Sequence, residues 1–512
     1  MTDDSAKHSG PDDQPGGPSR RTGGFPGRGV EVAAKLFFLV VWLGCLIVCL
    51  VRIFRAISFT TPWLITTRGY EEEALFSIWK FTQGLPVFND PLKIPYSASY
   101  FNWAFYFFYG SATKIVLALF HLDAVWLPTI CRLLTLSFGL LGGGLFFLAL
   151  RECGPGWRFW SWPFLLLWCV IPVINPLCGF WLIAARPDIG AFAFEMAGLI
   201  FFLRYLRTGR IFLIVAAAAV FYAAWSFKQV NVSALGGISL TLLVLRDWRA
   251  LAVLLGLWLP PVMLTLVIGG SDYRYCLLMS QLHCSFLPSN VVVYVIEAIK
   301  GNPLIPMILA VMAYLALTQR RALVARSAEL TLLATSLCAL ALTLLLLCKT
   351  GGAENYFIPL GAWLALWFIT WSGRIQPPIF HLALVLSSFL VMLKLGVIVF
   401  KRSDDTRWMH EPHLRLAERL AVLPGPVFVT DLYGNLPWIQ RQAPHFVIAY
   451  SYDLDSRAGV QHERGGWEGL LRDGYFNTVV TQTADDPAMT PYLGHYEFIA
   501  EDDGYRFYRR KP

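Results

Sequence analysis

Long apolar segments recur along most of the first 400 residues, and each is close in length to one helical crossing of a membrane. A hydrocarbon core about 30 Å thick requires about 20 apolar residues per helical span. The first run, Val32 to Phe54, is too long for a signal-peptide core, so we interpret it as a retained span. Further runs lie near residues 102–120, 126–150, 160–183, 189–205, 211–227, 230–245, 250–269, 303–318, 329–348, 356–372 and 379–400. The runs predict a polytopic α-helical membrane protein with about 11 to 13 transmembrane helices.

The composition agrees with this prediction, because 56% of the residues are hydrophobic and only 15% are charged. The net charge of +8 is spread over short turns between apolar runs, as at Arg204, Arg207 and Arg210. That distribution is typical of cytoplasmic loops and does not indicate a nucleic-acid partner. No Walker loop, dinucleotide-binding glycine motif or zinc signature appears in a suitable context. The sequence therefore argues against transport driven by ATP and does not require a divalent metal.

The ten cysteines lie mostly within apolar runs, as at Cys45 and Cys169, and show no paired spacing for a metal. We interpret them as packing residues. A disulfide between Cys276 and Cys284, which share one candidate outer loop, is the lesser alternative.

Basic residues predict the orientation of the chain in the membrane. The clusters lie at Arg151 and Arg158, at 204–210, at Arg246 and Arg249, at 320–326 and at Arg374, and two runs separate each from the next. All of them can be cytoplasmic together, as the positive-inside rule favours. The junctions near 186, 228, 272–290 and 349–356 then lie outside. The scheme requires an odd number of crossings between 102 and 150, where two runs occur, so either one run is re-entrant or interfacial or the early loops depart from the rule.

Changes in composition mark three regions. Residues 1–30 are rich in Gly, Pro, Ser and Asp and predict a disordered cytoplasmic tail. Residues 31–400 form the transmembrane domain, with a first outer loop at 55–101. Residues 401–512 are charged and punctuated by Pro and Gly, and predict a small extracytoplasmic α/β domain. Its expected helices are 414–423 and 467–472, and its expected strands are 426–430, 445–450, 476–481, 496–500 and 505–509.

An acidic cluster, Glu71, Glu72 and Glu73, begins the polar segment 69–84 of the first loop. Apolar residues at helical spacing follow the cluster, and Gly84 closes the segment, so we expect an interfacial helix. The carboxylates suit the positive end of the helix dipole, which is one sufficient explanation. A carboxylate beside the bilayer is also a natural general base.

Polar residues interrupt the apolar runs at five further places. The candidate binding residues there are Asn102, Arg186, Asp188, Lys228, Gln229, Arg274, Lys349, Glu354, Asn355 and Tyr356. Asn102 lies among aromatic residues, where an amide requires a partner. Arg186 and Asp188 flank a proline, and either form a local cap and ion pair or mark a substrate pathway. The predicted outer cations Lys228, Arg274 and Lys349 are suited to a phosphate or pyrophosphate.

The order of these features resembles the GT-C superfamily of membrane glycosyltransferases, in particular the bacterial branch related to the protein mannosyltransferases and the lipid A aminoarabinose transferases. The resemblance covers roughly residues 30–400. It implies transfer of a sugar from a polyprenyl-phosphate carrier, on the outer face, by an acidic residue of the first outer loop. That position maps onto Glu71, Glu72 or Glu73, and the distance to Gly84 favours Glu71 or Glu72.

The resemblance implies an inverting enzyme of the bacterial inner membrane that uses a lipid-linked sugar donor. The expected acceptor is an envelope glycan, lipid or protein, and the C-terminal domain is expected to help bind it. The alternative is a secondary transporter or flippase-like envelope protein, since polar breaks in helices also mark transport sites. We see no internal inverted repeats, which disfavours the transporter. A third alternative is an envelope assembly factor without catalytic activity.

Overall fold

The computed structural model describes residues 71–153, 181–279, 282–301, 327–372, 410–441, 450–483 and 489–512, together with isolated positions between 32 and 57, at 313 and at 393. The predicted tail at 1–30 lies outside these residues. So do nearly all of the expected spans at 160–183, 303–318 and 379–400, most of the first span, and all but one residue of the expected strand 445–450.

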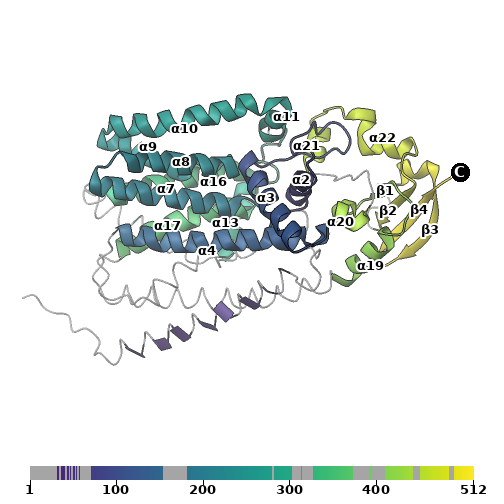
Figure 1. Ribbon diagram of the computed structural model, residues 1–512, viewed down its shortest axis with the longest axis horizontal. Coiled ribbons are helices and arrows are strands. Elements are labelled where there is room, and N and C mark those ends of the chain that lie inside the picture. Colours follow the sequence, from purple (N-terminus) through teal and green to yellow (C-terminus); the bar gives the residue numbers. More distant parts are fainter. Residues whose placement is uncertain are drawn as a thin grey trace, which may run out of the picture.

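Long helices run alongside one another in one bundle, and a small C-terminal sheet lies beyond one end of it (Figure 1). The bundle helices are α3 (Trp103–Leu119), α4 (Leu127–Cys153), α7 (Asp188–Thr208), α8 (Phe212–Phe227), α9 (Ser233–Leu245), α10 (Trp248–Ile268), α13 (Ser289–Gly301), α16 (Ser327–Leu347) and α17 (Phe357–Ser372). All but α13 coincide with a predicted apolar run. Helix α13 lies between the predicted runs 250–269 and 303–318 and was not predicted; Glu297 and Lys300 interrupt its apolar residues.

Four helices of the described part are long and apolar enough to cross a membrane: Ala124–Cys153, Asp188–Thr208, Trp248–Ile268 and Ser327–Leu347. Shorter apolar helices accompany them, so the prediction of a polytopic α-helical membrane protein is confirmed. Within the most apolar 18-residue window of each helix, 72% of the window is buried in α7 but only 11% in α10. Lipid tails are as apolar as leucine. Helix α7 is therefore central, and the exposed face of α10 suits contact with lipid.

Helices α9 and α16 pack with their backbones in close contact. A Cβ added at Gly237 would lie only 2.3 Å from the Cα atom of Thr335. Small residues are common where membrane helices pack closely, because they let the backbones approach. Any larger residue at 237 would push α16 away.

The helix expected in the first loop is present as α2 (Glu72–Thr82), at the end of the bundle that is nearer the sheet (Figure 1). Gly84 follows it with φ of +71°, a left-handed conformation that glycine adopts without strain. The side chains of Leu75, Phe76 and Ile78 are buried in the core. The apolar spacing and Gly84 thus predicted the helix and its end.

The C-terminal region contains a four-stranded sheet in the order β1-β2-β4-β3, formed by β1 (Val427–Val429), β2 (Thr478–Gln482), β3 (Tyr496–Asp502) and β4 (Tyr505–Arg510). Strands β1 and β2 are parallel, and the other pairs are antiparallel. The accompanying helices are α19 (His410–Leu420), α20 (Pro437–Gln440), α21 (Tyr450–Arg457) and α22 (Gly466–Arg472). The predicted strands other than 445–450 are present, but Tyr450 begins α21 instead of ending a strand.

The sheet region is joined to the bundle by polar contacts with two connections, the first loop and the segment after α10. The Tyr96 hydroxyl of the first loop donates to the Glu463 carbonyl at 2.6 Å, and the Glu463 N–H donates to the Leu92 carbonyl at 2.8 Å. The buried carboxylate of Asp455 accepts from the Tyr275 hydroxyl at 3.2 Å and contacts His283 Nδ1 at 2.5 Å. These contacts fix α21 above the end of the bundle where α2 lies.

Candidate functional site

A cavity of about 660 Å³ lies between this end of the bundle and the C-terminal region. Its lining includes residues of at least six separate segments: the start of α2, the turns before α7, after α8 and before α17, and the helices α21 and α22. Eight of the predicted site residues line it, namely Glu72, Glu73, Arg186, Lys228, Gln229, Lys349, Asn355 and Tyr356. The fold thus brings together residues that are up to 284 positions apart, from Glu72 to Tyr356 (356 − 72).

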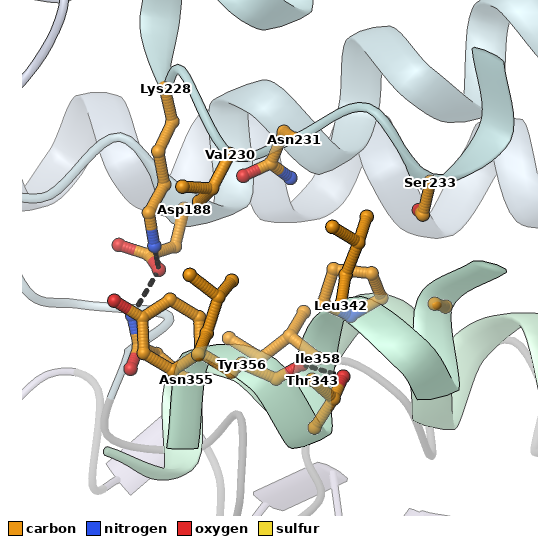
Figure 2. A pocket seen from close by; sticks show the side chains of 13 residues that line it. Asp188, Lys228, Val230, Asn231, Ser233, Leu342, Thr343, Asn355, Tyr356 and Ile358 are labelled. Carbon is orange, nitrogen blue, oxygen red and sulfur yellow. Dashed lines mark hydrogen bonds and ion pairs between the residues drawn. The ribbon is translucent and has the colours of Figure 1, made fainter. Parts of the chain in front are cut away.

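One buried carboxylate ties three of these segments together. Asp188, at the start of α7, accepts hydrogen bonds from Asn355 Nδ2 at 2.6 Å and from the Lys228 ammonium. Figure 2 shows the two partners meeting at Asp188, beside a smaller cavity of about 30 Å³. Arg186 Nε lies 3.5 Å from Asp188 Oδ2. The local ion pair considered from the sequence is therefore present, but it is long. Asp188 therefore acts mainly between segments.

Aromatic rings hold the cations along the cavity wall. The Lys228 and Lys349 ammonium groups lie 5.0 and 5.8 Å from the ring centroid of Tyr356. The Arg186 guanidinium lies 4.9 Å from the ring centroid of Phe101 and 5.0 Å from that of Trp181. Cation–π attraction within about 6 Å helps to orient each of these cations, and Lys228 also has its close ion pair with Asp188. Three cations consequently border one cavity.

The three glutamates of the acidic cluster have different surroundings. Glu71 is fully buried: it accepts from both Nε (3.1 Å) and Nη2 of Arg132, and from the Ala185 N–H at 2.9 Å. Glu72 lines the cavity, and its Oε2 accepts from the Glu71 N–H at 3.0 Å. Glu73 also lines the cavity and is half-buried. The capping explanation holds in part, since Glu72 and Glu73 occupy the first turn of α2.

Comparison with solved structures identifies the fold of the chain. No family model and no curated protein sequence matches the chain. Among solved structures, ArnT from Cupriavidus metallidurans, in a crystal structure bound to undecaprenyl phosphate, is similar over 94% of this chain and 98% of its own, with a TM-score of 0.57 and 15% identity. The chain has the GT-C fold. An oligosaccharyltransferase from Archaeoglobus fulgidus is similar over 91% of this chain and 74% of its own, with a TM-score of 0.46 and 11% identity.

Five predicted residues do not line the cavity of this GT-C fold: Glu71, Asn102, Asp188, Arg274 and Glu354. Asn102 caps α3, donates to the Trp225 carbonyl at 2.8 Å and accepts from the Tyr273 hydroxyl. It has the partners that a buried amide needs. Arg274 is exposed and donates to the Leu266 carbonyl at 3.2 Å. Of the three cations expected to bind a phosphate together, Lys228 and Lys349 line the cavity and Arg274 does not. Arg186 is the third cation of the cavity instead.

Sequence reasoning missed several residues of the site. Arg132 is the buried partner of Glu71, and a lone arginine inside the run 126–150 was the available signal, because charges within a span are costly and usually functional. Glu195 is similar: it is buried in α7 and accepts from the Ser233 hydroxyl and the Ala234 N–H. Residues of α21 and α22 that line the cavity carried no comparable signal.

The cysteines and metal-ligand candidates add no further centre within the described ranges. Cys276 and Cys284 are both free, so the disulfide considered from the sequence is not formed. Among the described residues, no three His, Cys, Asp or Glu side chains are arranged to hold a metal ion.

Proposed function

We propose that this chain is an inverting glycosyltransferase that moves a sugar from a polyprenyl-phosphate carrier to an acceptor hydroxyl within the 660 Å³ cavity. The observation that carries the proposal is that carboxylates and cations line the same cavity: Glu72 and Glu73 together with Arg186, Lys228 and Lys349. The reaction takes place at the outer face of a bacterial plasma membrane, and the lipid tail remains in the bilayer.

The cations are suited to the donor phosphate. Negative charge grows on the phosphate as its bond to the sugar breaks, and fixed positive groups stabilise that charge most effectively where water is excluded. Lys228 is buried, and Asp188 and the Tyr356 ring hold its ammonium in place. The similarity to ArnT, whose structure contains undecaprenyl phosphate, supports a lipid phosphate as the ligand.

Glu72 is the proposed general base. Its carboxylate removes the proton of the acceptor hydroxyl, and the acceptor oxygen attacks the anomeric carbon from the face opposite the phosphate. The new C–O bond forms as the C1–O bond to the phosphate breaks, and the polyprenyl phosphate leaves with the bonding electrons. Glu72 fits both the distance to Gly84 and the lining of the cavity. Single displacement inverts the anomeric configuration.

Glu71 has a different role in this proposal. Its carboxylate already receives hydrogen bonds from Arg132 and from the Ala185 backbone. Glu71 also does not line the cavity, so an acceptor bound there would not reach it. We assign Glu71 to holding α2 against α4 and against the turn before α7.

The test is glycosyl transfer by the full-length chain in membranes, from radiolabelled polyprenyl-phosphate sugars, with Glu71→Gln, Glu72→Gln and Glu73→Gln compared singly. Loss of a general base typically costs about 10²- to 10⁴-fold, and we expect this loss for Glu72→Gln. A comparable loss only in Glu73→Gln would transfer the role to Glu73. Full activity in all three variants and in the triple variant would reject a carboxylate base. Absence of transfer with every lipid-linked sugar, together with dissipation of a solute gradient, would establish the transporter instead.

A further inference from the structure

The side of the cavity formed by the C-terminal region has a chemistry of its own. We call it the acceptor wall, and it consists of Tyr452, Asp453 and Ser456 on α21 and Trp467 and Glu468 on α22. It combines two aromatic rings, a hydroxyl and two carboxylates. Among the described residues that this region contributes to the cavity, none is Lys or Arg. The cations of the cavity all belong to the bundle side.

The acceptor wall is held rigid by contacts among its own residues. The Tyr452 hydroxyl donates to the Glu468 carboxylate and accepts from the backbone N–H of Trp467 at 3.2 Å. Burial and the neighbouring Glu468 raise the pKa of Tyr452, so its hydroxyl keeps its proton. The Trp467 ring is stacked on Phe428 of β1, with 5.4 Å between the ring centroids. A ligand therefore meets an ordered aromatic surface that does not have to form on binding.

The acceptor wall is also fixed relative to the bundle. Asp455, in α21 between Asp453 and Ser456, contacts Tyr275 and His283 of the connection after α10. The ring of Tyr96, in the first loop, packs edge-on to Tyr452 at 5.7 Å between centroids. The wall thus keeps a set position opposite the cations, and a molecule lying on it would present its polar groups toward the bundle side.

Each class of acceptor makes a different demand on such a wall. A sugar ring has an apolar C–H face, which stacks on an aromatic ring, and a rim of hydroxyls, which donate to carboxylates. Asp453 pairs with Arg457 of the same helix at 2.6 Å, so the carboxylate that mainly repels a phosphorylated or otherwise anionic group is Glu468. A lipid acceptor would need an apolar lining near its reacting end, and the carboxylates oppose that. The neutral sugar is the acceptor that these residues suit best.

We propose that the acceptor is a neutral glycan, whose terminal sugar stacks on Trp467 and donates hydrogen bonds to Asp453 and Glu468. This assignment rests on the proposed function and deepens it. The cavity then has two ends: the donor phosphate lies at Arg186, Lys228 and Lys349, and the acceptor enters along α21 and α22. The acceptor hydroxyl meets the anomeric carbon between them, beside Glu72.

The test separates acceptor binding from donor chemistry. The full-length chain, reconstituted in lipid nanodiscs, is assayed with a polyprenyl-phosphate sugar for slow donor hydrolysis by water and for transfer to a panel of neutral oligosaccharides. Trp467→Ala, Trp467→Phe, Asp453→Asn and Glu468→Gln are compared with Phe498→Ala and Glu497→Gln, which lie on β3 and do not line the cavity. We expect Trp467→Ala and Glu468→Gln to raise the acceptor KM about tenfold or more. Donor hydrolysis should remain within about twofold of wild type, because attack by water does not require binding of a sugar at the acceptor wall.

Binding of the same oligosaccharides without donor, measured by calorimetry, repeats the comparison independently of catalysis. Trp467→Phe keeps an aromatic ring beside Phe428 and should retain more affinity than Trp467→Ala, which guards against simple unfolding. Unchanged acceptor KM and affinity in the wall variants, with donor hydrolysis intact, would overturn the glycan assignment and leave the proposed function standing. So would productive transfer only to Ser- or Thr-containing peptides or to a lipid. Oligosaccharide binding that depends on Trp467, in a chain that neither hydrolyses nor transfers any donor, would instead reject the proposed function.

Discussion

The Arg132 guanidinium on α4 and the Glu71 carboxylate at the start of α2 form an ion pair that is closed to solvent, with side-chain exposures of 0% and 1%. The pair ties the acidic end of the interfacial helix to the long helix beneath it. Glu71 also accepts from the Ala185 N–H, so the same carboxylate orients the turn that carries Arg186 into the cavity. One buried contact thereby sets the position of residues on both sides of the site.

Breaking this pair from one side should strongly destabilise the protein. Arg132→Met leaves the Glu71 carboxylate buried without its cation, at an expected cost of about 3–5 kcal/mol in the free energy of unfolding. The measurement is unfolding of the purified chain in detergent. The double variant Glu71→Leu with Arg132→Met removes both charges and should recover much of the loss. Equal destabilisation of the single and double variants would contradict an uncompensated buried charge as the cause.

Removal of the Lys228 ammonium should impair the proposed transfer, measured per folded protein because the change also leaves the buried Asp188 without its close cation. We expect Lys228→Met to lower kcat about 10²- to 10³-fold, because the leaving phosphate loses a preorganised positive group. Lys228→Arg keeps the charge and should lose less. Lys300→Met, on the exposed surface of α13, and Arg274→Ala, outside the cavity, serve as controls and should behave as wild type. Rates of Lys228→Met within about twofold of wild type would exclude a role in the chemical step.

Asp455 should control how firmly α21 is attached to the bundle. Asp455→Ala removes the acceptor of Tyr275 and His283, and hydrogen bonds to a charged group are worth about 1.5–3 kcal/mol. Hydrogen exchange of the backbone amides of α21 should become faster. Asp473→Asn, which changes an exposed carboxylate paired with Arg464, is the matched control. Exchange in α21 that stays as slow as in wild type would show that other contacts hold the helix.

Lys80 gives a pH dependence of stability with a defined sign. Burial lowers its pKa from 10.5 to about 8, although it donates to the Val87 carbonyl and to Asn89 Oδ1. Below about pH 8 the amine is charged in both the folded and the unfolded chain, so the cost of burying the charge is present in full. Between about pH 8 and 10.5 the folded chain has lost the proton first, and the cost is relieved.

The stability of wild type should therefore rise relative to Lys80→Met as pH increases from about 8, by up to about 1.4 kcal/mol per pH unit. Thermal unfolding of both proteins between about pH 7 and 10 measures the difference. Lys93→Met changes an exposed lysine and should show no such slope. Parallel pH curves for wild type and Lys80→Met would contradict the lowered pKa.

Much of the fold was present in the sequence as periodicity and composition. Apolar runs predicted helices such as α4, α7 and α16, since the bilayer imposes one length on every span. The pattern from Glu71 to Gly84 predicted α2 and its end. The prediction was incomplete where local signals were mixed: α13 contains charged residues within an apolar stretch and was not among the predicted runs.

For the site, the sequence determined which residue types stand at the breaks between spans, because polar groups cannot be left in lipid without a partner. It did not determine which of these residues meet. Glu71 and Glu72 are neighbours in the chain, yet one is enclosed by Arg132 and the other lines the cavity. That separation depends on how α2 packs against α4. The acceptor wall likewise exists only because α21 and α22 fold over the end of the bundle where α2 lies. Trp467 and Glu72 are nearly 400 positions apart in the sequence, yet both line the cavity.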